Sequence, residues 1–394
     1  MKPLGDFQRY LLEEFVEDWR EGEMTRREMV RRAVYITGGA ASAATVLVSM
    51  GCAPQPAPTA VAKPTEAAKA APPTTAPAAT TAPTTAPAAA ATATGAPAKP
   101  SAPTPANTAA AAAAPTTVAT ATPAAAKPTG ASGTPAAGAN PPGTPRPQPT
   151  PIGPRSPLTV AENDPAVNTK KVEFDGEAGK LFGYLARPKA AGSYAGLIVI
   201  HENRGLTPHI QDVTRRAAKE GFVALAVDLV SRAGGTDKVT DPAQLGGVLG
   251  QAKPEDLVAD LSSGVKYLQA QEGVKKDKIG AIGFCMGGGY TFRLATANRE
   301  IKAAVPFYGP APPLDQIPNT NAAILGIYAA NDNFVTPSMA GVEDALKKAG
   351  KTYEIKVYPN VGHAFHNDTG TAWNEAAAVD AWKQAMDWFR KYLA

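Results

Sequence analysis

A long run of small residues and prolines divides the chain and limits what it can fold into. Residues 53–157 are almost wholly alanine, proline and threonine, with no aromatic residue and few large aliphatic ones. Such a segment cannot bury enough apolar surface to offset the entropy that is lost when a backbone is ordered. Its prolines also interrupt the helix that alanine would favour. We therefore predict a disordered, extended linker, which serves either as a stalk or simply as slack chain.

The segment before this linker, residues 1–52, has the features of an export signal rather than of a folded domain. Residues 1–24 are polar and charged, Thr25-Arg26-Arg27 begins a short basic stretch, and residues 33–51 are uncharged and mildly apolar. A charged leader, paired arginines and an apolar run are typical of export signals. The string at residues 25–30 resembles a twin-arginine signal, so we expect the twin-arginine export machinery to carry a folded domain out of the cytoplasm.

The apolar run closes with Gly51-Cys52, a small residue before a cysteine. This ending resembles the cleavage and lipidation site of a bacterial lipoprotein. We therefore expect lipidation of Cys52 and a protein that is exported, extracytoplasmic and tethered to the cell membrane. An uncleaved membrane anchor is the alternative, since ~18 or more apolar residues can span a bilayer. A chance match in a cytoplasmic protein is the remaining explanation.

The rest of the chain, residues 158–394, is long enough for one large core. Short apolar runs predict strands at 196–200, 222–227, 279–283, 303–307, 323–328 and 353–358. Longer amphipathic stretches predict helices at 209–220, 254–271, 286–297, 336–349 and 373–392. Apolar strands that alternate with helices imply an α/β fold, with a mostly parallel, twisted sheet covered by helices on both faces. Residues 170–187 alternate and contain Gly183, which predicts an antiparallel edge hairpin.

Charge and histidine spacing argue against two kinds of partner. The formal charge of +4 comes from the linker, because acidic and basic residues balance over residues 158–394, and no basic stripe suggests nucleic-acid binding. His201, His209 and His366 do not have zinc-ligand spacing. We therefore expect no metal site and no cofactor.

The strand at 279–283 leads into a motif that carries chemistry. Its continuation is Gly283-Phe284-Cys285-Met286-Gly287, a Gly-x-Cys-x-Gly pattern. This is the nucleophile-elbow pattern with cysteine in place of serine, and its glycines leave room for a tight strand-to-helix turn. The following helix begins there, so its N-terminal amides and dipole favour both a thiolate and an oxyanion. We predict that Cys285 is a nucleophile.

Two further polar residues follow later strands. Asp332 comes after strand 323–328, and His363 comes after strand 353–358. Because ligands bind at the carboxyl ends of the strands in such sheets, Cys285, Asp332 and His363 should meet there. Nucleophile, acid and histidine is the chain order of α/β-hydrolases, in which the acid orients the imidazole and the imidazole moves the proton. Each residue alone could be structural, but all three in this order argue against coincidence.

The motifs together resemble those of the dienelactone hydrolase family. The resemblance covers residues 170–392 and rests on these strings: Ile200-His201-Glu202-Asn203-Arg204-Gly205, Gly283-Phe284-Cys285-Met286-Gly287-Gly288, Asn331-Asp332 and Gly362-His363-Ala364-Phe365. It implies a Cys-His-Asp triad, and a glutamate, Glu202, that meets the cysteine thiol. It also implies that the backbone amides of Met286 and Asn203 form the oxyanion hole.

A carboxylate beside a thiol raises the pKa of the thiol unless the carboxylate takes the proton itself. We therefore expect Cys285 to rest as a protonated thiol that Glu202 holds, and to be activated when substrate displaces this glutamate. A structural salt bridge between Glu202 and Arg204 is the alternative.

The resemblance also bears on the substrate. Relatives that act on dienelactone clamp its carboxylate with two arginines; Arg232 matches one of them, but Asn367 stands where the other would be. Half of the clamp is missing, which argues against dienelactone itself. His366 and Asn367 should instead form a neutral, hydrogen-bonding rim, with Arg204 and Arg232 as further substrate-binding candidates.

The sequence thus predicts a hydrolase of small carboxylic esters or lactones that works through a thioester on Cys285. One alternative keeps the fold without the catalysis, as a binding module at the cell surface. Another is a redox-sensing thiol, for which residues 158–394 offer no second cysteine.

Overall fold

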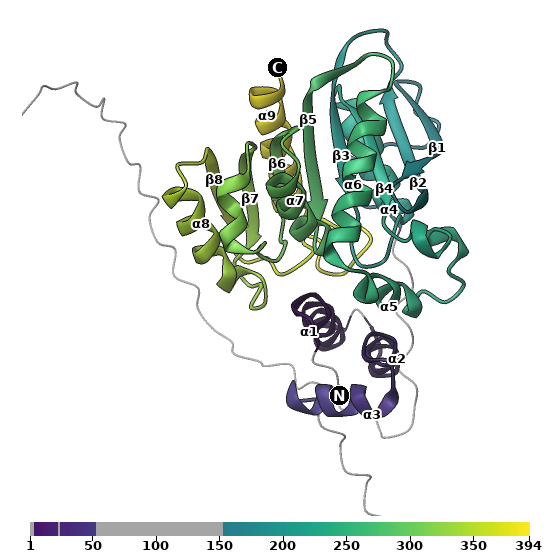
Figure 1. The fold of residues 1–394 in the computed structure, drawn as a ribbon, viewed down its shortest axis with the longest axis vertical. Helices are drawn as coiled ribbons and strands as arrows, with labels where there is room; N and C mark the ends of the chain where they lie inside the picture. Colours follow the sequence, from purple (N-terminus) through teal and green to yellow (C-terminus); the bar gives the residue numbers. More distant parts are fainter. Residues whose placement is uncertain (1–3, 23, 53–152) are drawn as a thin grey trace, which may run out of the picture. The chain divides into compact units, whose positions relative to one another are not determined.

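The computed structural model describes residues 4–22, 24–52 and 153–394 (Figure 1). Most of the predicted linker lies outside the described residues. Its predicted end was placed too late, because Arg155 and Ser156 already donate backbone hydrogen bonds to Asp368 of the folded domain.

One mixed sheet organises the domain that follows the linker. Its eight described strands are β1 (Val167–Gly176), β2 (Gly179–Pro188), β3 (Tyr194–Ile200), β4 (Val223–Asp228), β5 (Val274–Phe284), β6 (Ile301–Phe307), β7 (Ala323–Ala329) and β8 (Tyr353–Tyr358). They pair in the order β1-β2-β4-β3-β5-β6-β7-β8. The β1–β2 and β2–β4 pairs are antiparallel and the others are parallel. The predicted edge hairpin and mostly parallel sheet are confirmed.

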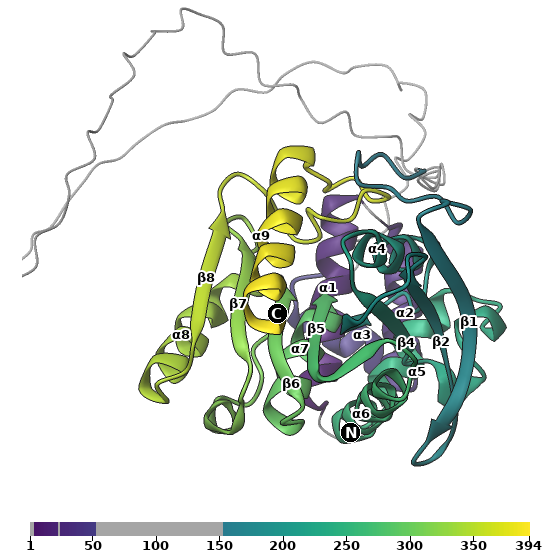
Figure 2. The ribbon, with the colours of Figure 1, turned by 90° about the horizontal axis from the view of Figure 1, so that it is seen from above.

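Helices cover both faces of this sheet. They are α4 (Pro208–Lys219), α6 (Pro254–Gln269), α7 (Met286–Ala297), α8 (Met339–Lys348) and α9 (Glu375–Leu393). Helix α5 (Ala243–Gln251) instead lies beyond the carboxyl ends of the strands (Figure 1). Figure 2 shows α4 and α9 on one face and α6 on the opposite face. Short 3-10 helices span Ser231–Ala233, Thr236–Lys238, Leu314–Asn319 and Thr336–Ser338. This is the predicted α/β-hydrolase arrangement.

Helix α5 was not predicted. Its sequence contains Gly246, Gly247 and Gly250, and glycine in a helix interior costs roughly 1 kcal/mol relative to alanine. Local propensity therefore argues against this helix, and tertiary packing must stabilise it.

The N-terminal segment forms three helices, which corrects the prediction that residues 1–52 have no fold. They are α1 (Asp6–Glu21), α2 (Arg26–Thr37) and α3 (Ala40–Ser49). The buried side chains of α1 include Leu11, Leu12 and Phe15, so this polar and charged helix still has an apolar face. The side chain of Thr25 caps α2 by accepting a hydrogen bond from the Glu28 amide.

Two further observations concern these helices. Within the described ranges, no helix is both long enough and apolar enough to cross a bilayer. Helix α1 lies beside the carboxyl ends of the parallel strands, at the edge toward which β5 points (Figure 1). That is the edge at which the catalytic residues were predicted to meet.

Candidate active site

Cys285 sits on a sharp turn between β5 and α7. Its backbone has φ 57° and ψ −124°, a conformation that non-glycine residues rarely adopt. The neighbouring glycines make the turn possible: a Cβ on Gly283 would lie 2.2 Å from the Gly287 carbonyl oxygen, and one on Gly287 would lie 2.4 Å from that of Ile200. The turn therefore projects Cys285 from the end of β5 at the first turn of α7.

His363 and Asp332 form a buried pair near this cysteine. The Nδ1 of His363 lies 2.7 Å from Asp332 Oδ2, and Asp332 Oδ1 accepts hydrogen bonds from the amides of Phe334 and Val335. Burial alone would raise the pKa of Asp332, but His363 and these donors hold that pKa below its ordinary value. Burial alone would lower the pKa of His363, but Asp332 holds it well above its ordinary value.

The thiol of Cys285 is protonated in this arrangement. Burial, followed by the nearby Glu14 carboxylate, raises the pKa of Cys285 to about 12. The sulfur of Cys285, a ring nitrogen of His363 and a carboxylate oxygen of Glu14 all lie within 4.8 Å of one another. These atoms are close enough for a proton to pass from the sulfur to the imidazole once the imidazole has lost its own Nε2 proton.

Glu14, a residue of α1, accepts a hydrogen bond from this thiol and was not among the predicted site residues. The Cys285 thiol donates to Glu14 Oε1 at 2.7 Å, and Asn203 Nδ2 donates to the same oxygen at 2.6 Å. The hydroxyl of Tyr10, one turn earlier, lies 3.6 Å from the sulfur. Burial raises the pKa of Glu14 from 4.5 to about 7, although His363 opposes the shift. No local pattern marked Glu14, because its partner lies 271 positions away.

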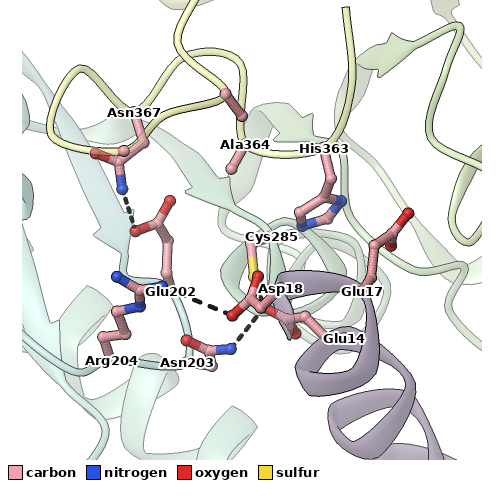
Figure 3. A pocket seen from close by; sticks show the side chains of 12 residues that line it. Glu14, Glu17, Asp18, Glu202, Asn203, Arg204, Cys285, His363, Ala364 and Asn367 are labelled. Carbon is pink, nitrogen blue, oxygen red and sulfur yellow. Dashed lines mark hydrogen bonds and ion pairs between the residues drawn. The ribbon is translucent and has the colours of Figure 1, made fainter. Parts of the chain in front are cut away.

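The structure therefore corrects the partner predicted for the thiol. Glu202 lines the same pocket, but its Oε2 accepts a hydrogen bond from Asn367 Nδ2 at 2.8 Å (Figure 3). Its Oε1 is buried without a hydrogen-bond partner among the described residues. Asn367 thus contributes a neutral donor at the pocket.

The two residues predicted to form the oxyanion hole lie at the same edge. Met286 is the first residue of α7, where backbone amides have no partner within the helix. Asn203 lies in the loop after β3, and its side chain reaches the acid that contacts Cys285. Gly287 fits closely against the carbonyls of Ile200 and His201, which keeps this loop and the elbow together.

Two predicted substrate-binding residues lie elsewhere. Arg232 donates from Nε and Nη2 to the two carboxylate oxygens of Asp260 and does not line the pocket. His366 is buried, with its ring centroid 5.0 Å from that of Phe284 and 5.8 Å from that of Trp382. Neither forms part of the rim, because Arg232 is paired with Asp260 and His366 packs among aromatic rings. Both contacts are with residues distant in the sequence, so the motifs did not predict them. Arg204 does line the pocket.

The cavity beside Cys285 is small while α1 lies over it. It measures about 40 Å³, room for only a few water molecules. Glu14, Glu17 and Asp18 of α1 form one wall, and Figure 3 shows them facing His363 and the loop that carries Arg204. Asp18 is ion-paired with Arg204 at 3.6 Å.

The cluster of Glu14, Cys285 and His363 also has the ligand types of a zinc site. The predicted absence of a metal rested on other histidines, and it stays a prediction.

Known proteins resemble the domain that carries these residues. Residues 181–393 match the model of the dienelactone hydrolase family. A Salmonella typhi protein assigned as a carboxymethylenebutenolidase is 32% identical over 250 residues, covering 60% of this chain and 92% of the relative. An Escherichia coli K12 protein assigned the same name is 33% identical over 253 residues, with 60% and 93% coverage. The crystal structure of a protein assigned as a dienelactone hydrolase from Klebsiella pneumoniae aligns with a TM-score of 0.54 at 32% identity, covering 58% of this chain and 100% of that one.

Proposed function

Because the chain belongs to the dienelactone hydrolase family, we propose that it hydrolyses carboxylic esters or lactones through a thioester intermediate on Cys285. The observation that supports this most is the cysteine on a strained turn at the start of α7, beside a histidine that an acid orients. Cys285 is the nucleophile, His363 the acid and base, and Asp332 the residue that positions His363.

The chemistry follows from these positions. His363 takes the thiol proton, and the sulfur attacks the carbonyl carbon of the ester. The amides of Met286 and Asn203 stabilise the negative oxygen of the tetrahedral intermediate. The intermediate collapses to a thioester as the alcohol leaves with the proton from His363. Water, deprotonated by His363, then attacks the thioester, and the acid is released as the thiol regains its proton.

The polar groups around the thiol bear on the substrate. Arg204 and Asn367 line the pocket, whereas Arg232 is held by Asp260. The site therefore lacks the two-arginine clamp expected for dienelactone. We propose a small ester or lactone that needs at most one charged contact, and the Cys285 thiol stays protonated beside Glu14 before substrate binds.

Replacement of the nucleophile tests the proposal. The full chain should release nitrophenol from a nitrophenyl ester, and intact-mass spectrometry after acid quenching should show an acyl group on Cys285. Cys285→Ala should remove both signals, with circular dichroism as the control for folding. Equal turnover by the two proteins would overturn the proposed role of Cys285.

We also propose that the protein is exported by the twin-arginine machinery and tethered to the membrane through a lipid on Cys52. The paired arginines, the uncharged run and Gly51-Cys52 support this. Cys52→Ala should move the chain from the membrane fraction to the soluble extracytoplasmic fraction. An unchanged distribution would contradict a lipid tether on Cys52.

A further inference from the structure

Helix α1 fills the space that a substrate of Cys285 would need. The domain surface under α1, which we call the groove, includes Cys285, Asn203, Tyr290 and Phe334. We propose that this groove binds a carboxylate joined to an aromatic group, and that α1 occupies it as an intramolecular ligand that keeps the site closed. This inference rests on the proposed function, because it takes the groove to be the substrate site. The acid part of the ester would thus carry an aromatic ring, and α1 would have to leave the groove before turnover.

The carboxylate of Glu14 occupies the position of the acid product. Hydrolysis of an acyl-cysteine leaves a carboxylate next to the sulfur, and Glu14 Oε1 lies 2.7 Å from Cys285 Sγ. Asn203 Nδ2 donates to the same oxygen, so protein donors hold this carboxylate as they would hold a product. A substrate carbonyl cannot reach the sulfur while Glu14 is there.

Aromatic rings of α1 fill the adjoining space. The ring centroid of Tyr10 lies 5.3 Å from that of Phe334, and the ring of Phe7 meets Tyr290 edge-on at 5.4 Å. These distances are typical of favourable aromatic pairs. The Tyr10 hydroxyl lies 3.6 Å from Cys285 Sγ, so the aromatic space continues up to the nucleophile. The groove therefore suits an acyl group that carries an aromatic ring.

Helix α5 is shaped for this docking. A Cβ on Gly246 would lie 2.4 Å from Cζ of Phe15 in α1, and one on Gly247 would lie 2.6 Å from Cβ of Tyr35 in α2. The glycines of α5 weaken it as a helix, but they allow the N-terminal helices to approach closely. This fit is independent of the contacts at Cys285.

Ion pairs at the edge also hold the N-terminal helices. Asp18 of α1 pairs with Arg204, a residue of the pocket, at 3.6 Å. Arg31 of α2 pairs with Asp241, just before α5. The helices thus meet the domain with apolar, aromatic and charged contacts.

Removal of the segment would open the site. Cleavage before Cys52, the predicted processing site, would separate α1 covalently from the domain. An intramolecular ligand would then become a separate molecule that can diffuse away, and its high effective concentration would be lost. The enzyme would thus turn over esters slowly before processing, when α1 leaves the groove only transiently, and fast afterwards.

The test uses the full chain and one added methyl group. Gly246→Ala should displace Phe15 while making α5 a better helix, so α1 should leave the groove. We expect the rate of Cys285 alkylation by iodoacetamide to rise by about ten- to a hundredfold, the effect of one overpacked contact. Gly341→Ala in α8, where the added Cβ meets only a leucine side chain at 3.3 Å, is the matched control and should leave the rate unchanged.

A second variant distinguishes release of α1 from misfolding of Gly246→Ala. Phe15→Ala should also raise the alkylation rate, and Phe15→Ala with Gly246→Ala should alkylate no faster than Phe15→Ala alone, because the new methyl group then has no ring to displace. If none of these variants alkylates faster than the wild type, α1 does not close the site, and the inference is overturned.

Turnover and protection separate the two proposals. Faster alkylation of Gly246→Ala without turnover of any ester would leave the closed site standing and count against the proposed function. Ester turnover with equal alkylation rates in all variants would support the proposed function and contradict the closed site. In Gly246→Ala, phenylacetate should protect Cys285 from alkylation more strongly than acetate does. Equal protection by the two acids would contradict the aromatic part of the groove.

Discussion

Each residue of the proposed triad depends on a neighbour for its charge state. Burial and Glu14 keep Cys285 as a thiol, whereas Asp332 favours a protonated His363. In the closed site the sulfur thus has its proton, and the imidazole cannot accept it until it loses its own. Departure of α1, and of Glu14 with it, would remove one cause of the raised thiol pKa. His363 then needs Asp332 to hold its ring in the orientation that presents Nε2 to the sulfur.

Asp332 should be needed for turnover because it orients the ring of His363. Asp332→Asn should keep the fold but lose the acceptor for His363 Nδ1–H, so the imidazole should adopt the wrong tautomer. We expect ester turnover to fall by about 10³- to 10⁴-fold, the effect of the equivalent change in a serine protease triad. Steady-state kinetics in the Gly246→Ala background would measure it. Asp344→Asn, an exposed carboxylate of α8, is the control, and a loss below tenfold would argue against the orienting role.

At the scale of the element, α1 is the part of the molecule whose position most affects the site. Its buried acid, Glu14, faces His363 and Cys285 of the domain, with Asp18 and Tyr10 nearby on α1 itself. The pKa of Glu14 is raised in the docked helix, so docking takes up a proton. Docking is therefore most favourable at pH values below about 4.5 and weakens as the pH rises toward about 7.

The pH dependence of α1 docking can be measured at Cys285. Between pH 5 and 7 the docking equilibrium should weaken by up to about tenfold for each pH unit, the limit for a single proton. Glu14→Gln cannot titrate, so the ratio of the wild-type to the Glu14→Gln alkylation rate at Cys285 should rise over this range. Iodoacetamide reacts with the thiolate, so both rates rise as the thiol ionises, and the ratio removes this shared dependence on pH. A flat ratio would contradict proton-linked docking.

At the scale of the whole molecule, a buried ionic network joins the start of the folded domain to its centre. Asp368 Oδ2 accepts from the backbone amides of Arg155 and Ser156 and from Arg216 of α4, and its Oδ1 lies 2.9 Å from His209 Nδ1. Burial alone would raise the pKa of Asp368, but His209 and Arg216 hold it below its ordinary value. The network lies next to Asn367 and so supports the loop beside Glu202.

Removal of this charge should destabilise the domain. Asp368→Asn leaves Arg216 without one of its buried partners, and we expect unfolding free energy to fall by about 3–5 kcal/mol. Because its pKa is depressed, Asp368 contributes at pH values above about 3.8 and loses its contribution as the pH falls. Urea unfolding at pH 7 and pH 3 should therefore show a difference from the wild type that shrinks at the lower pH. A constant difference would mean that packing, rather than charge, causes the loss.

The sequence by itself determined the sheet, the elbow and the order of the three triad candidates. These features depend on short patterns: apolar runs that alternate with helices, glycines around Cys285, and polar residues after strands. Such patterns can be predicted because neighbours in the chain impose them.

Only the tertiary structure decided which side chains touch. It put Glu14 rather than Glu202 on the thiol, paired Arg232 with Asp260, and buried His366 among aromatic rings. It also made a helix of the glycine-rich α5, against its propensity. Each of these outcomes depends on how surfaces from distant parts of the chain fit together, and no local pattern encodes that fit.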